Sequence, residues 1–168
     1  DGSGSVLLKA DPTSALGAAT KQYVDSAAAG LQFKDSVQAR TTASLPAYTQ
    51  SGTGVGATLT ADANGAFPTI DGVTVASTER VLVDSNGTTT DVDNGVYTLT
   101  QVGDGSNPWI LTRATDLDQD SEVVSGIAVI ADAGTISANQ LYVLTTANPI
   151  TVDTTAQVFD QLQIGSTF

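Results

Sequence analysis

The sequence predicts a mainly β protein, in which a short N-terminal α-helix is followed by a β-sandwich or small β-barrel module. From Phe33 onward helix signals vanish, and short apolar runs alternate with turn residues to the end of the 168-residue chain. Many short strands at regular spacing are typical of sandwiches and small barrels. Aromatic residues make up only 5% of the chain and Met is absent. Such a chain builds a modest core per residue, which oligomerisation would supplement.

The N-terminal part opens with a flexible lead at residues 1–5 and then carries a helix signal. Asp11 and Pro12 are suited to the N-cap and the first helical position, and Gly30 to the left-handed C-terminal cap. The expected helix therefore spans residues 12–29. Its apolar stripe of Leu16, Ala19 and Tyr23 is narrow, so the helix would be marginal alone in water. Either copies pack in a parallel bundle or one helix docks on the next domain.

The remaining chain, residues 34–168, is predicted to be a separate β-rich module after a joint at residues 1–33. Within it, Asp71-Gly72 favours a tight hairpin turn between 69–70 and 73–75. Residues 44–66 are rich in Gly, Ser, Thr and Ala, and residues 53–65 are expected to be a long loop with one short strand at 57–60. The other expected strands span residues 37–42, 80–84, 96–102, 109–113, 127–131, 141–144 and 158–164.

Charge separates the same two parts. The chain has six basic and eighteen acidic residues, a net charge of −12, and residues 41–168 carry all of that excess. An acidic surface argues against nucleic acid, whose phosphates need Lys and Arg. It also disfavours anionic membrane surfaces, and no apolar run approaches the length of a membrane span, so no membrane insertion is expected.

The chemistry available for catalysis is limited. The chain has no His and no Cys, which excludes Ser–His–Asp and Cys–His arrangements. No Gly-rich loop precedes a Lys-Ser or Lys-Thr pair, so no phosphate-binding loop is expected. The chain has enough carboxylates to supply the pair that glycoside hydrolysis needs, but Asp in turns ordinarily has a structural role. We therefore expect no enzyme, no catalytic residue and no organic cofactor.

The densest acidic stretch is the candidate metal site. Asp116, Asp118, Asp120 and Glu122 alternate along it, and alternating carboxylates can supply oxygen ligands to calcium. The stretch lacks the Gly and the final Glu of an EF-hand loop. A second candidate is residues 91–94. The alternative for both is a set of solvated turns in which Asp side chains bond the backbone.

Two further motifs concern carbohydrate. Trp109 with Tyr97 would form either a sugar-stacking surface or part of the core, since a lone Trp next to an alternating strand is commonly buried. Asn86-Gly87-Thr88 fits the N-glycosylation pattern, which matters only in a secretory pathway.

Two stretches resemble a known family. Residues 10–25, Ala-Asp-Pro-Thr-Ser-Ala-Leu-Gly-Ala-Ala-Thr-Lys-Gln-Tyr-Val-Asp, closely resemble the DPT-x-ALGAATKQYVD segment of tail-fibre and related structural proteins of tailed bacteriophages. The stretch from Lys34 to about Gln161, with Ile70-Asp71-Gly72-Val73 and Asn94-Gly95-Val96-Tyr97, is similar to a β-rich module that follows this segment in many phage fibre proteins. Together they cover roughly residues 6–163, without the attachment domain or receptor-binding tip that usually flanks them.

The resemblance implies a homotrimeric fibre with a helical trimerisation joint and a β-rich fibre module, located on the surface of the virion. The expected function is structural, in a tail fibre or related virion appendage, with other tail or appendage proteins as partners and a contribution to host attachment. Three alternatives stay open: a module that binds host-surface glycan, a depolymerase of capsular sugar, and a secreted bacterial filament or adhesin domain.

Overall fold

The computed structural model describes residues 30–84 and 92–162, and in these residues the protein is mainly β, with two sheets and no helix. The helix expected at residues 12–29 lies outside the described residues, as do Asn86-Gly87-Thr88 and residues 163–164 of the last expected strand.

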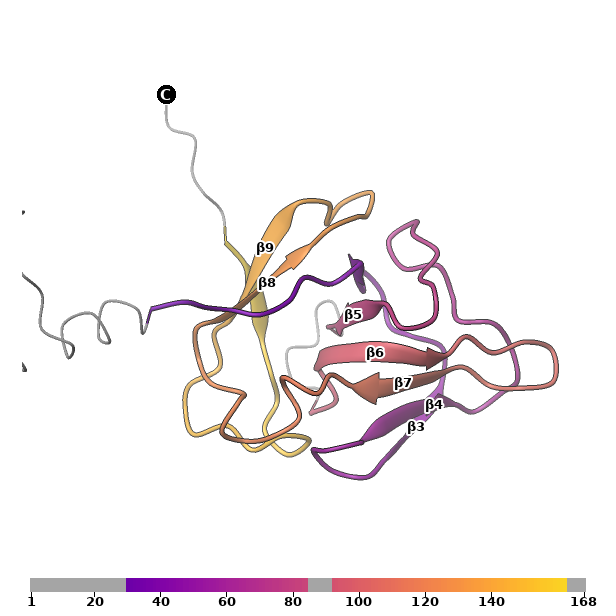
Figure 1. Cartoon of the computed structure of the whole chain (residues 1–168), viewed down its shortest axis with the longest axis horizontal. Coiled ribbons are helices and arrows are strands. Elements are labelled where there is room, and N and C mark those ends of the chain that lie inside the picture. Colours follow the sequence, from indigo (N-terminus) through magenta and orange to yellow (C-terminus); the bar gives the residue numbers. More distant parts are fainter. Residues whose placement is uncertain (1–29, 85–91, 163–168) are drawn as a thin grey trace, which may run out of the picture.

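The larger sheet has six strands in the order β2-β5-β6-β7-β4-β3 (Figure 1). β2 is parallel to β5, and all other neighbours are antiparallel, with an irregularity in β6 between Leu99 and Gln101. The strands are β2 Ala39–Arg40, β3 Tyr48–Ser51, β4 Thr58–Ala61, β5 Arg80–Val83, β6 Gly95–Gln101 and β7 Ile110–Arg113.

The smaller sheet has four strands in the order β1-β8-β9-β10. β1 is parallel to β8, while β8, β9 and β10 are antiparallel neighbours. The strands are β1 Gln32–Phe33, β8 Ile127–Ala131, β9 Gln140–Leu144 and β10 Phe159–Gln161.

A single stretch of chain joins the edges of the two sheets. After β1, Val37 forms a bridge with Ala131 of β8, and the N–H of Gln38 then donates to the carbonyl of Arg80, 2.8 Å away. The strand expected at residues 37–42 is therefore short, because the backbone pairs with the smaller sheet at Val37 and with the larger sheet from Gln38 onward.

Most expected strands are found, and β4 coincides closely with the strand expected at residues 57–60. β3, a strand that the sequence did not predict, pairs with β4 to form a hairpin. β3 alternates half-buried and exposed positions and lies at the edge of its sheet. Its sequence, Tyr-Thr-Gln-Ser, therefore contains little of the apolar alternation by which a strand is recognised.

The turn at Asp71-Gly72 is confirmed. Both residues have positive φ, 49° and 79°, as a type I′ turn requires, and Ile70 pairs with Val73 across it. The carbonyl of Asp71 accepts a hydrogen bond from the N–H of Thr135, which ties this turn to the β8–β9 connection.

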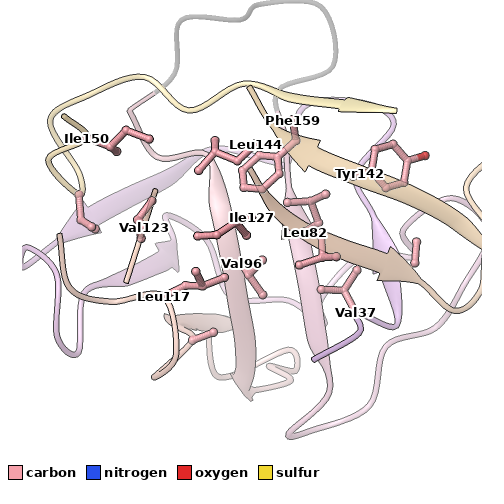
Figure 2. Packing of buried hydrophobic residues seen from close by; sticks show 14 residues of the cluster. Val37, Leu82, Val96, Leu117, Val123, Ile127, Tyr142, Leu144, Ile150 and Phe159 are labelled. Atoms are coloured by element: carbon pink, nitrogen blue, oxygen red, sulfur yellow. The ribbon is translucent and has the colours of Figure 1, made fainter. Parts of the chain in front are cut away.

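The first core cluster lies between the two sheets. Leu82 of β5 and Val96 of β6 contribute from the larger sheet, and Ile127, Leu144 and Phe159 from the smaller one (Figure 2). All five side chains are 5% exposed or less. The sheets are therefore held together by apolar burial, the main favourable contribution to folding.

The second cluster covers the other face of the larger sheet. Val81, Leu99 and Leu111 lie on this face, and Phe67 and Trp109 pack against them from outside the strands. Since β5 is covered on both faces, its residues Val81 to Val83 are all apolar and buried, as a strand between two layers requires.

Candidate functional site

The acidic stretch at residues 116–122 lies in the connection between β7 and β8. The Asp116 carboxylate accepts two hydrogen bonds from the Arg80 guanidinium, Nη1–Oδ1 at 2.8 Å and Nη2–Oδ2 at 3.2 Å. Its carbonyl accepts a further bond from Lys34 Nζ at 2.9 Å. Asp116 thus anchors this connection to β5 and to the segment after β1.

Glu122 and Asp118 form a second unit within the same stretch. Glu122 Oε2 accepts from the backbone N–H groups of Asp118 and Gln119, at 3.3 and 3.2 Å, and so closes a turn. Asp118 is only 4% exposed. Burial, and then the neighbouring Glu122 carboxylate, raise the pKa of Asp118 above its ordinary value.

Asp120 contacts a different part of the chain. Its Oδ1 accepts a hydrogen bond from the backbone N–H of Val152 at 2.8 Å. Across residues 30–84 and 92–162, no group of three or more His, Cys, Asp or Glu residues is arranged to hold a metal ion. Asp116, Asp120 and Glu122 therefore bind different parts of the chain, and calcium binding stays a prediction that a chelator experiment tests.

The second acidic candidate is only partly described, since Asp91 lies outside the described residues. Asp93 Oδ2 accepts from the Tyr48 hydroxyl at 3.2 Å, and its carbonyl accepts from the Tyr97 hydroxyl at 2.7 Å. These bonds fix the approach of the chain to β6.

The two aromatic residues considered for sugar stacking are buried. Trp109 is 2% exposed and Tyr97 1% exposed. The Trp109 ring meets the Phe67 ring edge-on, with centroids 5.3 Å apart and planes at 79°. The interpretation of Trp109 as a core residue is therefore confirmed, and this pair presents no face to a sugar.

A buried ion pair is the feature of the interior that the sequence did not reveal. Arg113 of β7 and Asp153 are bound to each other with side-chain exposures of 0% and 3%. The Arg113 guanidinium also lies 4.7 Å from the centre of the Tyr97 ring, and its Nη2 donates to the Tyr97 hydroxyl at 2.7 Å. Asp153 Oδ2 accepts from the N–H of Gly54 at 2.7 Å, which adds the β3–β4 turn to the network.

Gly95, the first residue of β6, lies directly against this network. Gly95 has φ of +149°, and a Cβ at this position would collide with Nη1 of Arg113. The preceding residue, Asn94, donates from Nδ2 to the carbonyl of Gln157 at 2.8 Å. Asn94-Gly95 therefore both starts the strand and leaves room for the buried guanidinium.

A candidate ligand surface is the groove beside the connection between β2 and β3. A cavity of about 340 Å³ is lined there by residues 41–46 and 68–71, with Thr42, Ser44 and Thr69 among them. A smaller cavity of about 50 Å³ lies against the same connection and reaches Asp84. Threonine and serine hydroxyls beside apolar atoms suit a neutral polar ligand such as a sugar.

Comparison with known proteins brings no match: no protein-family model, no curated protein and no solved structure is similar to the chain. Among the residues that the structure describes, there is also no helix with the length and apolar character needed to cross a membrane.

Proposed function

We propose that the chain is a structural module of a bacteriophage tail fibre or a related virion appendage, that it associates as a homotrimer, and that it contributes to host attachment. The observation that carries this proposal is the order of its two parts. The segment at residues 10–25, which resembles phage fibre proteins, is followed within a few residues by a β-rich body that begins at Gln32.

We infer further that the two sheets form a β-sandwich. The shared core cluster between them supports this arrangement, as does the stretch from Gln32 to Arg40, which pairs first with β8 and then with β5.

A purely structural role is consistent with the use of the acidic side chains. Asp116 binds Arg80, Asp120 caps a backbone N–H, and Asp153 binds Arg113. These groups hold connections in place and are not free to act as an acid and base pair. Release of reducing ends from capsular sugar, lost in Asp118→Asn, would instead establish a depolymerase.

Two measurements test the proposal. Light scattering of the full chain is expected to give about three times the 17.0 kDa chain mass, and a monomer at micromolar concentration would contradict the trimer. Antibody labelling of intact particles is expected to place the chain on a virion appendage. Its presence on bacterial filaments with none on virions would favour the adhesin alternative.

The groove at residues 41–46 and 68–71 supports a second candidate function, recognition of host-surface glycan. A glycan array and a cell-adsorption assay with the full chain test it. Ser44→Trp is expected to fill the groove and abolish binding, whereas Ser106→Trp, at an exposed turn position, is expected to keep it. Absence of binding by the wild-type chain leaves the structural role alone.

A further inference from the structure

The outer surface of the four-stranded sheet is apolar. Ile127, Val129 and Ala131 of β8 belong to the core cluster between the sheets, so the alternating residues Ala128 and Ile130 point outward. Ile130 is accordingly 40% exposed. An antiparallel sheet with one face in water ordinarily carries polar residues on that face, which this strand does not.

The neighbouring strands continue the same surface. In β9, Tyr142 and Leu144 point into the core, which leaves Leu141 and Val143 outward. Phe33 of β1 pairs with Ala128 and shares its side of the sheet. We call this surface the outer apolar face; it consists of Leu31, Phe33, Ile130, Leu141, Val143 and Leu162, of which Leu141 and Val143 are half-buried. Ala128 lies on the same side of the sheet but is itself 0% exposed.

Several side chains of the outer apolar face are exposed to solvent in the single chain. Phe33 is 63% exposed, Leu162 42% and Leu31 38%. Within β1, β8, β9 and β10 the only charged residue is Asp160, which pairs with Val143 and accepts a hydrogen bond from Thr145 Oγ1 at 2.7 Å. The face is therefore nearly uncharged in a chain of net charge −12.

The larger sheet provides an internal comparison. Thr58 of β4, Thr112 of β7 and Thr98 of β6 lie opposite one another in register, and the hydroxyls of Thr112 and Thr100 are 2.8 Å apart. These positions are half-buried or exposed. At these partly exposed positions of the larger sheet the side chain is threonine, whereas the outer apolar face carries Phe, Ile, Leu and Val, which indicates a surface that is covered.

We propose that the outer apolar face is the contact between copies of the chain in the homotrimer; this inference rests on the proposed function and names its contact surface. Residues 10–25, the expected trimerisation joint, lead directly into Leu31 and Phe33, the first residues of the face. Copies held together at the joint therefore bring their faces to a high effective concentration.

Charge also favours a second copy of the chain as the partner of the outer apolar face. Residues 41–168 carry the whole net charge of −12, so two copies repel each other where their acidic surfaces meet. Asp160 is the one charged strand residue on the side of the outer apolar face, so identical copies meet few like charges there, and burial of its aromatic and branched side chains supplies the attraction. The competing occupant, the chain's own residues 1–29, becomes an outcome of the test.

The first experiment measures self-association of the full chain by sedimentation equilibrium. Phe33→Asp and Ile130→Asp are expected to weaken association at least about tenfold, because each places a charge in an apolar contact. Val55→Asp and Ile136→Asp are matched controls at residues that are 70% and 71% exposed and lie outside the face, and they are expected to leave association unchanged. Trp109 fluorescence checks that each variant keeps the core.

The second experiment uses the absence of Cys in the chain. A single thiol introduced as Ile130→Cys is expected to react with a maleimide at least about tenfold more slowly than Ile136→Cys, and to regain the faster rate upon dilution to monomer.

A trimer whose association is insensitive to Phe33→Asp and Ile130→Asp would overturn this contact while leaving the proposed function intact. Slow labelling that persists in the monomer would show that residues 1–29 cover the face, and would also overturn it. A wild-type chain that is monomeric at micromolar concentration contradicts the trimer itself.

Discussion

Replacing Asp153 with Asn removes the charge that neutralises Arg113 inside the protein. Both side chains are buried, at 3% and 0% exposure. Asn has almost the same size as Asp and tolerates the positive φ of 58° at this position, so the change adds no backbone strain. Its amide oxygen also keeps an acceptor for the N–H of Gly54. The substitution therefore tests the charge with little disturbance of the packing.

The expected loss of stability is large because the guanidinium cannot reach water. Leaving one member of a buried ion pair without its partner costs about 3–5 kcal/mol. For a chain of this size, a loss of that magnitude lowers the Tm by about 6–20 °C. The same exchange at the half-buried pair, Asp116→Asn opposite Arg80, is expected to cost no more than about 1 kcal/mol, since those side chains are 31% and 18% exposed.

Urea unfolding at one fixed chain concentration measures both variants, with Trp109, which is 2% exposed, as the fluorescent probe. Adding Arg113→Met to Asp153→Asn removes the unpaired charge and is expected to recover part of the stability. The reasoning is refuted if Asp153→Asn costs no more than Asp116→Asn, or if the double variant is less stable than Asp153→Asn alone.

Three further changes have distinct outcomes. Burial raises the pKa of Asp71, but hydrogen bonds led by the N–H of Ser137 outweigh this effect and lower the pKa below the ordinary 3.8. Asp71→Asn should therefore lower the free energy of unfolding by about 1 kcal/mol at pH 7. Urea unfolding should show this deficit shrinking as the pH falls below 3.8. Burial and Glu122 raise the pKa of Asp118, so Asp118→Asn should match or exceed wild-type stability at pH 7, with any gain fading as the pH falls through that raised pKa. A chelator that lowers the Tm of wild type but not of Asp118→Asn would instead support calcium there. Trp109→Ala should cost about 3–5 kcal/mol by circular dichroism, and a smaller loss would contradict its place in the core.

The strands that were predicted well are those whose own residues carry a strong pattern. Residues 127–131 and 81–83 are all apolar and rich in Val and Ile, and both lie in strands of the structure. β3 was missed because an edge strand with one half-buried side needs few apolar residues. β1 was missed because two exposed residues, Gln32 and Phe33, become a strand only through pairing with β8.

The buried ion pair between Arg113 and Asp153 could not be predicted from local sequence either. Nothing local distinguishes Arg113, which is fully buried, from Arg80, which reaches the surface. Their acidic partners are 40 and 36 residues away in the chain. The alternation of β7 places Arg113 on the same side of the sheet as Tyr97, but the loop that brings Asp153 there follows from the packing of the whole chain.

The sequence by itself determined the β class, the Asp71-Gly72 turn and the lack of His and Cys chemistry, because these depend on residue identity and on periodicity over a few positions. Only the tertiary structure decided which carboxylates are paired and which sheet surface stays uncovered. Both depend on contacts between segments far apart in the chain. The outer apolar face is the clearest case, since Phe33, Ile130 and Leu162 come to share one sheet only when the first and last described strands join its two edges.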